Sequence, residues 1–481
     1  MRFVAYTVFL ATLLVLYFRT PSSIPLRLKI HQASVYLFYR STPTLCFYLN
    51  RLEPLFPRSF QTSQPYLSYK DYLCLDYTEM SQPASAEIAQ DLPAHPPSTT
   101  RVRLLTQNIF IRPSGINNNG NDYKSERLNY FAQNLFSSYD VICFQELFRF
   151  SLSCRYKGFI AQAKNAGFNY TLSSPPRGLT SFGIDAGLTI LSRFPIVASD
   201  FKQYDRGVHS DYWSLKGVLY AKIRINPPVP EQSVALPSEK LDGDDKDAQY
   251  FHIFNTHTQS SYGTLDLTET SVIKRLYQLY SMHQFIEKML QKNRQDDEPV
   301  FLLGDMNVDS RTHIINDPTD SSPSASDPQE KVGSTTPNYE QDVRDGKLSS
   351  PEYLAFKGVL EGYGLPDPTL FGLEKDDTLE GPSKYNFTDL HYSLNGYHPV
   401  TFGNTKIDGF GNLIPMETVL TTKSDNMVMH SLDYILSLNT PDSELQIGSV
   451  KAQPHFATEG INNFTQISDH YGMSADLIFK F

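Results

Sequence analysis

Short apolar runs that end in polar side chains are the feature that most restricts how this 481-residue chain can fold. The polar residues at the downstream ends of these runs are amides, carboxylates or imidazoles, namely Asn108, Glu146, Asn255 with His257, Asp305 with Asn307, Asp433, and Asp469 with His470. A buried strand that presents such a group at its end is a common way to build a site. Six such strand ends therefore predict a single site. Their chemistry indicates metal-assisted phosphoester hydrolysis.

The apolar runs have the length of buried strands. They alternate with two helical patterns, since Leu128, Phe131 and Leu135 share one face and apolar residues follow 4-3-4-3-4 spacing over 272–290. His283 lies inside the second stripe and is predicted to be a core histidine rather than a ligand. The class is α/β, and the predicted strands are 102–107, 141–144, 188–191, 218–223, 250–254, 300–303, 432–436 and 475–479.

Composition separates an N-terminal region from the rest of the chain. Residues 4–18 are almost entirely apolar, which is long for a signal-peptide core and short for a bilayer span. This favours an uncleaved membrane anchor, whereas a cleaved signal peptide would make the protein secreted or lumenal. We therefore predict an anchor or signal region at 1–81, a Pro-containing linker at 82–99 and a catalytic domain at 100–481. Loop insertions are expected near 227–247 and 310–350.

The formal net charge of −10 argues against a non-specific nucleic-acid binder. Such binding comes mainly from Lys and Arg side chains that neutralise phosphates. A locally basic groove is still compatible with this composition. The charge therefore excludes only a broadly basic protein.

The types of ligand atom indicate which metal ion would bind and which residue would act as the general base. The strand-end ligands are oxygen atoms without a thiolate, which suits Mg²⁺, Ca²⁺ or Mn²⁺ better than zinc. Glu146 is the first choice as ligand, and His470 is the candidate general base, because Asp469 or Asp433 could hold its ring in the accepting tautomer. A surface glutamate, a chance Asp-His pair and a plain turn at 304–307 are the simpler interpretations. The apolar runs before Glu146 and before 304–307 favour the functional interpretation of those motifs, and the Asp-His pair gains weight from the other strand-end residues.

The ordered motifs resemble those of the endonuclease/exonuclease/phosphatase superfamily over residues 100–481. They are TQN at 106–108, FQE at 144–146, NTH at 255–257, GDMN at 304–307, LDY at 432–434 and SDH at 468–470. Within the superfamily the chain is most similar to neutral sphingomyelinases, through GLTILSRFP at 187–195, KG at 216–217 and THTQS at 256–260. The resemblance implies a four-layer α/β/β/α sandwich of two packed mixed sheets, dependence on Mg²⁺ with Mn²⁺ as a substitute, and hydrolysis of sphingomyelin to ceramide and phosphocholine.

The resemblance also assigns each candidate residue a role in the attack of water on a phosphodiester. The metal ligands would be Glu146, Asn108 and Asp469. The general base would be His470, supported in catalysis by Asp433, His257, Asp305 and Asn307. The residues that bind substrate would be Lys216, Asp211 and Asn255.

Other functions stay open on the same scaffold. The enzymatic alternatives are a phospholipase C for other phospholipids or lyso-phospholipids, an inositol-phosphate phosphatase and a nuclease. A membrane-tethered binding module without catalysis is the alternative from a different class, and the joint presence of the motif residues argues against it. The expected partners are sphingomyelin and a membrane surface, reached through residues 4–18 or through Tyr212 and Trp213, with no nucleic acid.

Overall fold

The computed structural model describes residues 99–112, 122–149, 154–176, 184–226, 248–262, 265–313, 339–365, 369, 382–421, 427–438, 445–458 and 462–481. The predicted anchor region, the linker up to residue 98, the insertion 227–247 and residues 314–338 of the second insertion lie outside this part of the chain. Within it, no helix is long and apolar enough to cross a membrane.

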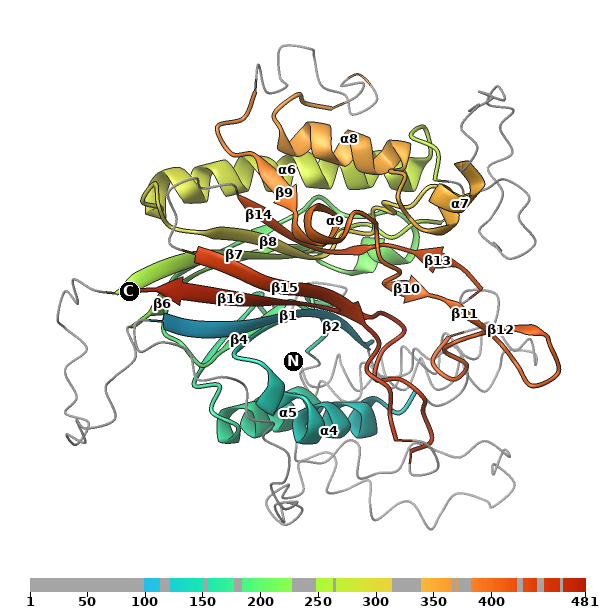
Figure 1. The fold of residues 1–481 in the computed structure, drawn as a ribbon. Coiled ribbons are helices and arrows are strands. Elements are labelled where there is room, and N and C mark those ends of the chain that lie inside the picture. Colours follow the sequence, from blue (N-terminus) through green and yellow to red (C-terminus); the bar gives the residue numbers. More distant parts are fainter. Residues whose placement is uncertain are drawn as a thin grey trace, which may run out of the picture. The chain divides into compact units, whose positions relative to one another are not determined.

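Two six-stranded mixed sheets form the centre of the described part (Figure 1). The first sheet has the strand order β15 (Leu445–Gln453), β16 (Gly472–Lys480), β1 (Thr99–Ile111), β2 (Val141–Leu147), β4 (Thr189–Ser192) and β3 (Tyr170–Ser173). The second has the order β5 (Ile196–Gln203), β6 (Gly217–Ile225), β7 (Gln249–His257), β8 (Val300–Asp305), β14 (Asp433–Leu438) and β9 (Phe387–Asp389). Two small two-stranded sheets pair β10 (Phe402–Gly403) with β13 (Met429–His430) and β11 (Thr405–Ile407) with β12 (Leu413–Pro415).

Apolar side chains from both large sheets share one buried core. Leu104 and Val141 of the first sheet belong to the same cluster as Ile253, Leu303 and Ile435 of the second. The outer face of the first sheet is covered by α4 (Lys124–Asn134) and α5 (Cys154–Asn165), and that of the second by α6 (Thr270–Asn293) and α8 (Pro351–Leu360) (Figure 1). The prediction of two packed mixed sheets is therefore confirmed, with helices on both outer faces. The short helices are α7 (Tyr339–Arg344), α9 (Leu390–Asn395), η5 (Phe136–Ser138) and η6 (His209–Trp213).

The strand pairing corrects one part of the strand-end prediction. Asp433 begins β14 instead of following it, and Asp469 and His470 precede β16. However, β14 runs antiparallel to β8, and β16 runs antiparallel to β1. The start of an antiparallel strand lies beside the end of its neighbour. These residues therefore lie at the same edge of the sheets as the ends of β1 and β8, although their own strands run in the opposite direction.

Gly304 lets β7 and β8 approach closely just before the predicted site. Its φ is 131°, and a Cβ atom added there would lie 2.1 Å from the carbonyl oxygen of Thr256 on β7. We expect Gly304→Ala to lower the free energy of unfolding by about 2–4 kcal/mol, because it adds both a backbone strain and a clash with main-chain atoms. Urea denaturation followed by fluorescence measures this change.

Gly358 in α8 provides the matched control. A Cβ atom there would meet no heavy atom within 4 Å. Gly358→Ala should therefore raise stability by about 0.5–1 kcal/mol, since alanine favours the helix over glycine. Equal effects of the two substitutions would show that Gly304 is not required by the approach of Thr256.

Candidate active site

Three predicted catalytic residues lie in a row across the second sheet. The register pairs His257 of β7 with Asp305 of β8, and Asp305 with Asp433 of β14. The Nε2 atom of His257 lies 3.5 Å from the Oδ2 atom of Asp305 and 4.0 Å from the Oε1 atom of Glu146, which comes from the first sheet. The predicted motifs therefore converge from both sheets.

Asn108 joins the ends of the two sheets. Its Nδ2 atom donates to Asp305 Oδ2 at 2.9 Å and to Glu146 Oε1 at 3.2 Å. Its Oδ1 atom accepts from the backbone N–H of Phe110 at 3.0 Å. In this arrangement the amide orients two carboxylates and does not turn an oxygen toward them. This differs from the predicted direct ligation of a metal by Asn108.

Both the ring and the backbone N–H of His470 are held by neighbouring side chains. Its Nδ1 atom lies 2.9 Å from Asp433 Oδ2, and its Nε2 atom lies 3.8 Å from Asp305 Oδ2. The hydroxyl of Ser468 accepts from the His470 backbone N–H and donates to the carbonyl of Asn108. In the neutral form of the ring, with Nδ1–H bonded to this carboxylate, the Nε2 lone pair is the acceptor. Of the two carboxylates considered from the sequence, the structure places Asp433 on the ring.

The backbone is unusual where two of these strands end. Glu146 has φ 54° and Asn307 has φ 50°, the left-handed region that residues other than glycine seldom adopt. The N–H of Asn307 donates to Asp305 Oδ1 at 2.9 Å, and its Nδ2 donates to the Thr258 carbonyl at 3.1 Å. Strained residues of this kind cluster at functional sites.

Burial dominates the charges of the site. It raises the pKa of Glu146 and of Asp305, and it raises the pKa of Asp469 to about 7, with a further contribution from Glu146. Burial also holds the pKa of His257 well below its usual value, with Lys216 and His470 adding to the effect, so His257 is neutral. Neither ring nitrogen of His257 has a hydrogen-bond partner among the residues that the structure describes. Its imidazole is therefore available to a substrate oxygen.

The pKa of His470 is shifted in the opposite direction to that of His257. Burial lowers its pKa, but the charges of Asp433 and Asp305 and the hydrogen bond to Asp433 outweigh burial and raise the pKa to about 10. The imidazole is thus protonated at neutral pH in the metal-free protein. The pKa of His470 would fall with a cation held nearby, because two positive charges repel.

The contribution of Asp469 and His470 to the stability of the metal-free protein is expected to fall as the pH rises. Asp469 has its pKa raised from 3.8 to about 7 and His470 from 6.5 to about 10, so the folded state binds both protons more tightly than the unfolded chain. The favourable contribution of His470 is complete below its unfolded pKa of 6.5 and is lost as the pH passes through about 10. The contribution of the Asp469 proton is lost between 3.8 and about 7.

Urea unfolding at several pH values between about 5 and about 9 measures this slope. Relative to the wild type, Asp469→Asn and His470→Gln should each lose less stability as the pH rises, since each removes one titrating group whose pKa is raised. A slope identical in all three proteins would contradict the assignment. Addition of Mg²⁺ should also flatten the slope, because the cation takes the place of the protons.

The donor set fits a hard divalent cation. Glu146 and Asp469 are carboxylates with raised pKa values, and the charge of Glu146 contributes to the shift at Asp469. A shared cation would remove this repulsion and supply the charge that burial disfavours. Mg²⁺ commonly binds one or two carboxylates and completes its shell with water and substrate phosphate. Glu146 and Asp469 are therefore the residues that would hold it.

The structure places the predicted substrate-binding residues in different surroundings. The Lys216 ammonium donates to Asp211 Oδ2 at 2.8 Å, and it also donates to the Thr258 carbonyl and the Ser260 hydroxyl. All three N–H groups are therefore used within the protein, and Lys216 acts on the site through its charge. Asn255 is fully buried, and its amide contacts the other sheet, including the side chain of Gln145 at 2.7 Å. The structure does not bring Asn255 into the site.

Several residues that support the site were not predicted. The hydroxyl of Thr401 accepts from the backbone N–H groups of Leu432 and Asp433. The buried guanidinium of Arg127 donates to the carbonyls of Ile109, which follows Asn108, and of Ile467, which lies two residues before Asp469. An arginine beside the apolar stripe of α4 was the only feature of the sequence that could have indicated these supporting residues.

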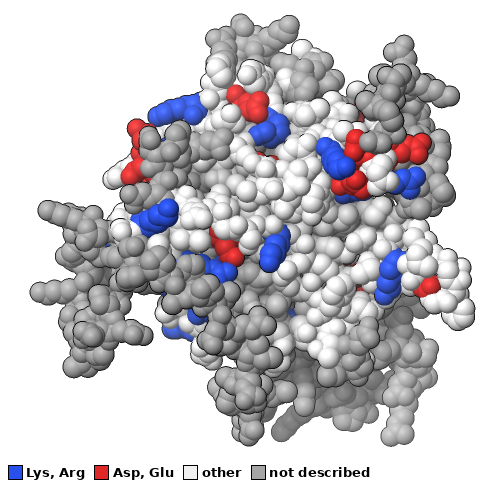
Figure 2. All heavy atoms as spheres, viewed as in Figure 1, with Lys and Arg blue, Asp and Glu red and all other residues white. Residues whose placement is uncertain are grey.

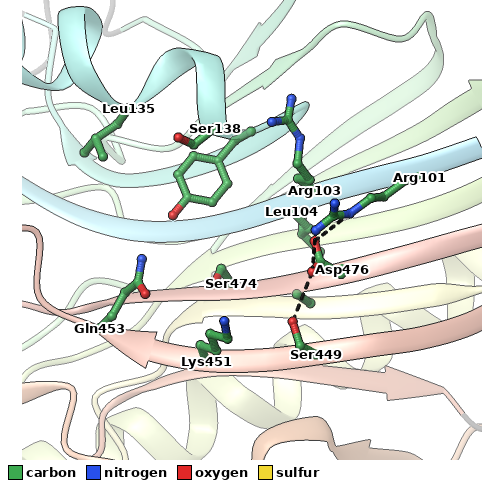
Figure 3. Close-up of a pocket in the computed structure, with 12 residues that line it drawn as sticks. Arg101, Arg103, Leu104, Leu135, Ser138, Ser449, Lys451, Gln453, Ser474 and Asp476 are labelled. Carbon is green, nitrogen blue, oxygen red and sulfur yellow. Dashed lines mark hydrogen bonds and ion pairs between the residues drawn. The ribbon is translucent and has the colours of Figure 1, made fainter. Parts of the chain in front are cut away.

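A hollow elsewhere on the described surface does not compete with this site. It has a volume of about 210 Å³ and lies over β1, β15 and β16 (Figure 3). Arg101 in this hollow is paired with Asp476, and Arg103 is paired with Asp140. Its two arginines are thus already paired, and its lining lacks the convergent carboxylates and imidazoles.

Comparison with known proteins supports the resemblance that the sequence motifs indicate. The model of the endonuclease/exonuclease/phosphatase family matches residues 114–372. A sphingomyelinase of Dictyostelium discoideum is 30% identical over 411 residues, which cover 76% of this chain and 77% of that protein. Sphingomyelinase C of Leptospira interrogans is 27% identical over 247 residues, which cover 47% of this chain and 38% of that protein. Phospholipase C of Staphylococcus aureus is 24% identical over 232 residues, covering 45% and 60%.

Solved structures are similar at lower identity. The crystal structure of SmcL is 19% identical, covers 78% of this chain and 98% of its own, and has a TM-score of 0.46. A beta toxin variant from Staphylococcus aureus with bound magnesium ions is 17% identical, covers 78% and 99%, and has a TM-score of 0.45. These scores add nothing to the assignment of the site.

Proposed function

Because this chain belongs to the endonuclease/exonuclease/phosphatase family, we propose that it is a magnesium-dependent phosphodiesterase that hydrolyses sphingomyelin to ceramide and phosphocholine. The curated relatives that it matches are sphingomyelinases and phospholipases C. The match to the Dictyostelium sphingomyelinase extends over 76% of the chain, and this supports the choice of lipid.

The observation that carries the proposal is the convergence of Glu146, His257, Asp305 and His470 at the ends of both sheets. His470, oriented by Asp433 at 2.9 Å, accepts a proton from the attacking water through Nε2. His257 is neutral and makes no hydrogen bond to the described residues through its ring, so its N–H donates to the phosphate oxygen on which charge builds. Asp305 lies within 3.8 Å of both imidazoles and orients them.

The proposed cofactor is Mg²⁺, or Mn²⁺ in its place, held by Glu146 and Asp469. When bound, it supplies positive charge to the phosphate and polarises its oxygens. Asn108 keeps Glu146 and Asp305 in position by donating to both carboxylates. No covalent intermediate with the protein is needed, because the base activates water directly.

An aromatic surface beside the site is suited to a lipid interface. Tyr212 and Trp213 are 48% and 54% exposed, and their rings lie 5.4 Å apart at the end of η6. The same short helix carries Asp211, which holds Lys216. Tyrosine and tryptophan favour the boundary between water and lipid, because one end of each ring is apolar and the other polar.

The surface charge supports a lipid rather than a nucleic acid as substrate. On the face shown in Figure 2, Lys and Arg side chains of the described residues are scattered among Asp and Glu side chains. Non-specific binding to a nucleic acid requires many cations along one surface. The net charge of −10 points in the same direction.

Release of phosphocholine from sphingomyelin in detergent micelles tests the proposal. We expect activity with Mg²⁺ and loss of activity with EDTA, restored by Mg²⁺ or Mn²⁺. Phosphatidylcholine, lyso-phosphatidylcholine, an inositol phosphate and plasmid DNA are the parallel substrates. Comparable turnover of DNA would overturn the lipid assignment, and preference for a glycerophospholipid would change the substrate to that lipid.

We propose a membrane-associated protein, tethered by the apolar segment 4–18. This segment lies outside the described residues, and the proposal rests on its composition alone. Carbonate extraction of membranes from cells that express the full chain provides the test. Removal of residues 1–81 should release the protein, whereas release of the full chain would contradict an anchor.

A further inference from the structure

A second group of metal-type ligands lies outside the proposed catalytic residues. It consists of Asp309, which follows β8, His313, and His430 of β13, whose ligand atoms all lie within 4.8 Å of one another. The Nε2 atom of His313 lies 2.5 Å from Asp309 Oδ2, and that of His430 lies 3.7 Å from the same oxygen. Two imidazole nitrogens therefore converge on one carboxylate oxygen.

The carboxylate of Asp309 is oriented for such a role. Its Oδ1 atom accepts from the backbone N–H groups of Ser431 at 2.9 Å and Arg311 at 3.1 Å. These two bonds fix the carboxylate plane and leave Oδ2 directed at the two histidines. Outer contacts of this type orient ligands in metal sites.

The separations are close to those of a tetrahedral metal site. Bonds of about 2.0–2.1 Å from zinc to oxygen and nitrogen place neighbouring ligand atoms about 3.3 Å apart. The observed 2.5 and 3.7 Å fall on either side of this value, and the two imidazole nitrogens lie within 4.8 Å of each other. The side chains of His313 and His430 are 19% and 14% exposed, which leaves a path from solvent.

From this geometry we propose that Asp309, His313 and His430 bind one divalent transition-metal ion of the zinc type. Imidazole nitrogens suit Zn²⁺, Co²⁺ and Ni²⁺, whereas Mg²⁺ prefers oxygen ligands. With three protein ligands, a water or another group completes the tetrahedron. The proposal concerns residues different from those assigned to Mg²⁺ and does not depend on the identity of the substrate.

The site is connected to the proposed general base through one residue. Phe402 pairs with His430 in the small sheet of β10 and β13, and it forms a bridge with His470. The ring of Phe402 lies 4.9 Å from the ring of His470. A metal at His430 would therefore stabilise the strand that packs against the base, and its first effect should be on thermal stability.

Titration of the full chain with Zn²⁺ in excess Mg²⁺, followed by calorimetry, tests the proposal. We expect one equivalent to bind, and Co²⁺ in its place to give the visible absorption of a four-coordinate site. His313→Ala and His430→Ala should each weaken the affinity by about 100-fold, since changes to outer contacts alone cost about 10- to 100-fold. Zn²⁺ should raise the melting temperature of the wild type but not of these variants.

His470→Gln is the matched control, because it removes a histidine from the other cluster. This variant should keep the stoichiometry and affinity for Zn²⁺ in excess Mg²⁺. Loss of binding in His470→Gln together with unchanged binding in His313→Ala and His430→Ala would overturn the proposal, as would a wild-type protein that binds no Zn²⁺ at micromolar concentration. Each of these readouts is independent of phosphodiesterase activity.

Discussion

Replacing His470 by glutamine is expected to reduce turnover of sphingomyelin by about 10²- to 10⁴-fold, the usual contribution of a general base. The imidazole is the only group of the described site whose lone pair is set up by a bonded carboxylate, Asp433 at 2.9 Å. Glutamine keeps a polar side chain of similar reach but cannot take up the proton of water. The steady-state rate of phosphocholine release at saturating Mg²⁺ measures the effect.

His283 gives the control for this prediction. It is fully buried on α6, with its Nε2 atom 3.4 Å from Glu287, and it packs on the outer face of the second sheet. His283→Gln should keep near wild-type turnover even if stability falls.

Asp433→Asn should lower turnover without loss of Mg²⁺ binding, since it acts on the orientation and charge of His470. Near wild-type turnover in His470→Gln would remove the proposed base.

The sequence predicted the strands that are buried on both faces and missed those at the margins. The eight predicted runs correspond to the four inner strands of each sheet, which are β16, β1, β2, β4, β6, β7, β8 and β14. The strands missed in these two sheets, β15, β3, β5 and β9, are their edges, and the short strands β10 to β13 of the two small sheets were missed as well. An inner strand reads as a continuous apolar run, whereas an edge strand such as β5 alternates half-buried and exposed residues with little apolar signal.

The sequence predicted the site residues that can be recognised as polar side chains at the ends of strands. Asn255 was included because it precedes His257 by two residues on the same face of β7. That spacing moves it about 7 Å deeper into the sandwich, where its amide meets Gln145 of the other sheet. Thr401 and Arg127 were missed because they bond to backbone atoms brought together only by the fold. Such partners leave no periodic pattern.

Replacing Glu146 by glutamine is expected to lower turnover by about 10²- to 10³-fold and to raise the Mg²⁺ concentration needed for half-maximal activity. Glu146 is the carboxylate that β2 presents to the site, with Oε1 bonded to Asn108 at 3.2 Å and 4.0 Å from His257 Nε2. Glutamine preserves the shape and the contact with Asn108 but removes the negative charge that a divalent cation requires. A dependence of activity on Mg²⁺ measured from micromolar to tens of millimolar separates weaker binding from slower chemistry.

Glu298 provides the matched carboxylate for this test. It is buried at the other end of the second sheet, where it bonds Lys222 at 2.7 Å and His252 at 2.7 Å. Glu298→Gln should destabilise the protein through the loss of a buried ion pair while leaving the Mg²⁺ dependence unchanged. The contrast matters because a general loss of folded protein lowers activity at every Mg²⁺ concentration, whereas loss of a ligand shifts the midpoint. An unshifted midpoint in Glu146→Gln would place the metal on other residues and would leave Glu146 only the role of a partner for Asn108.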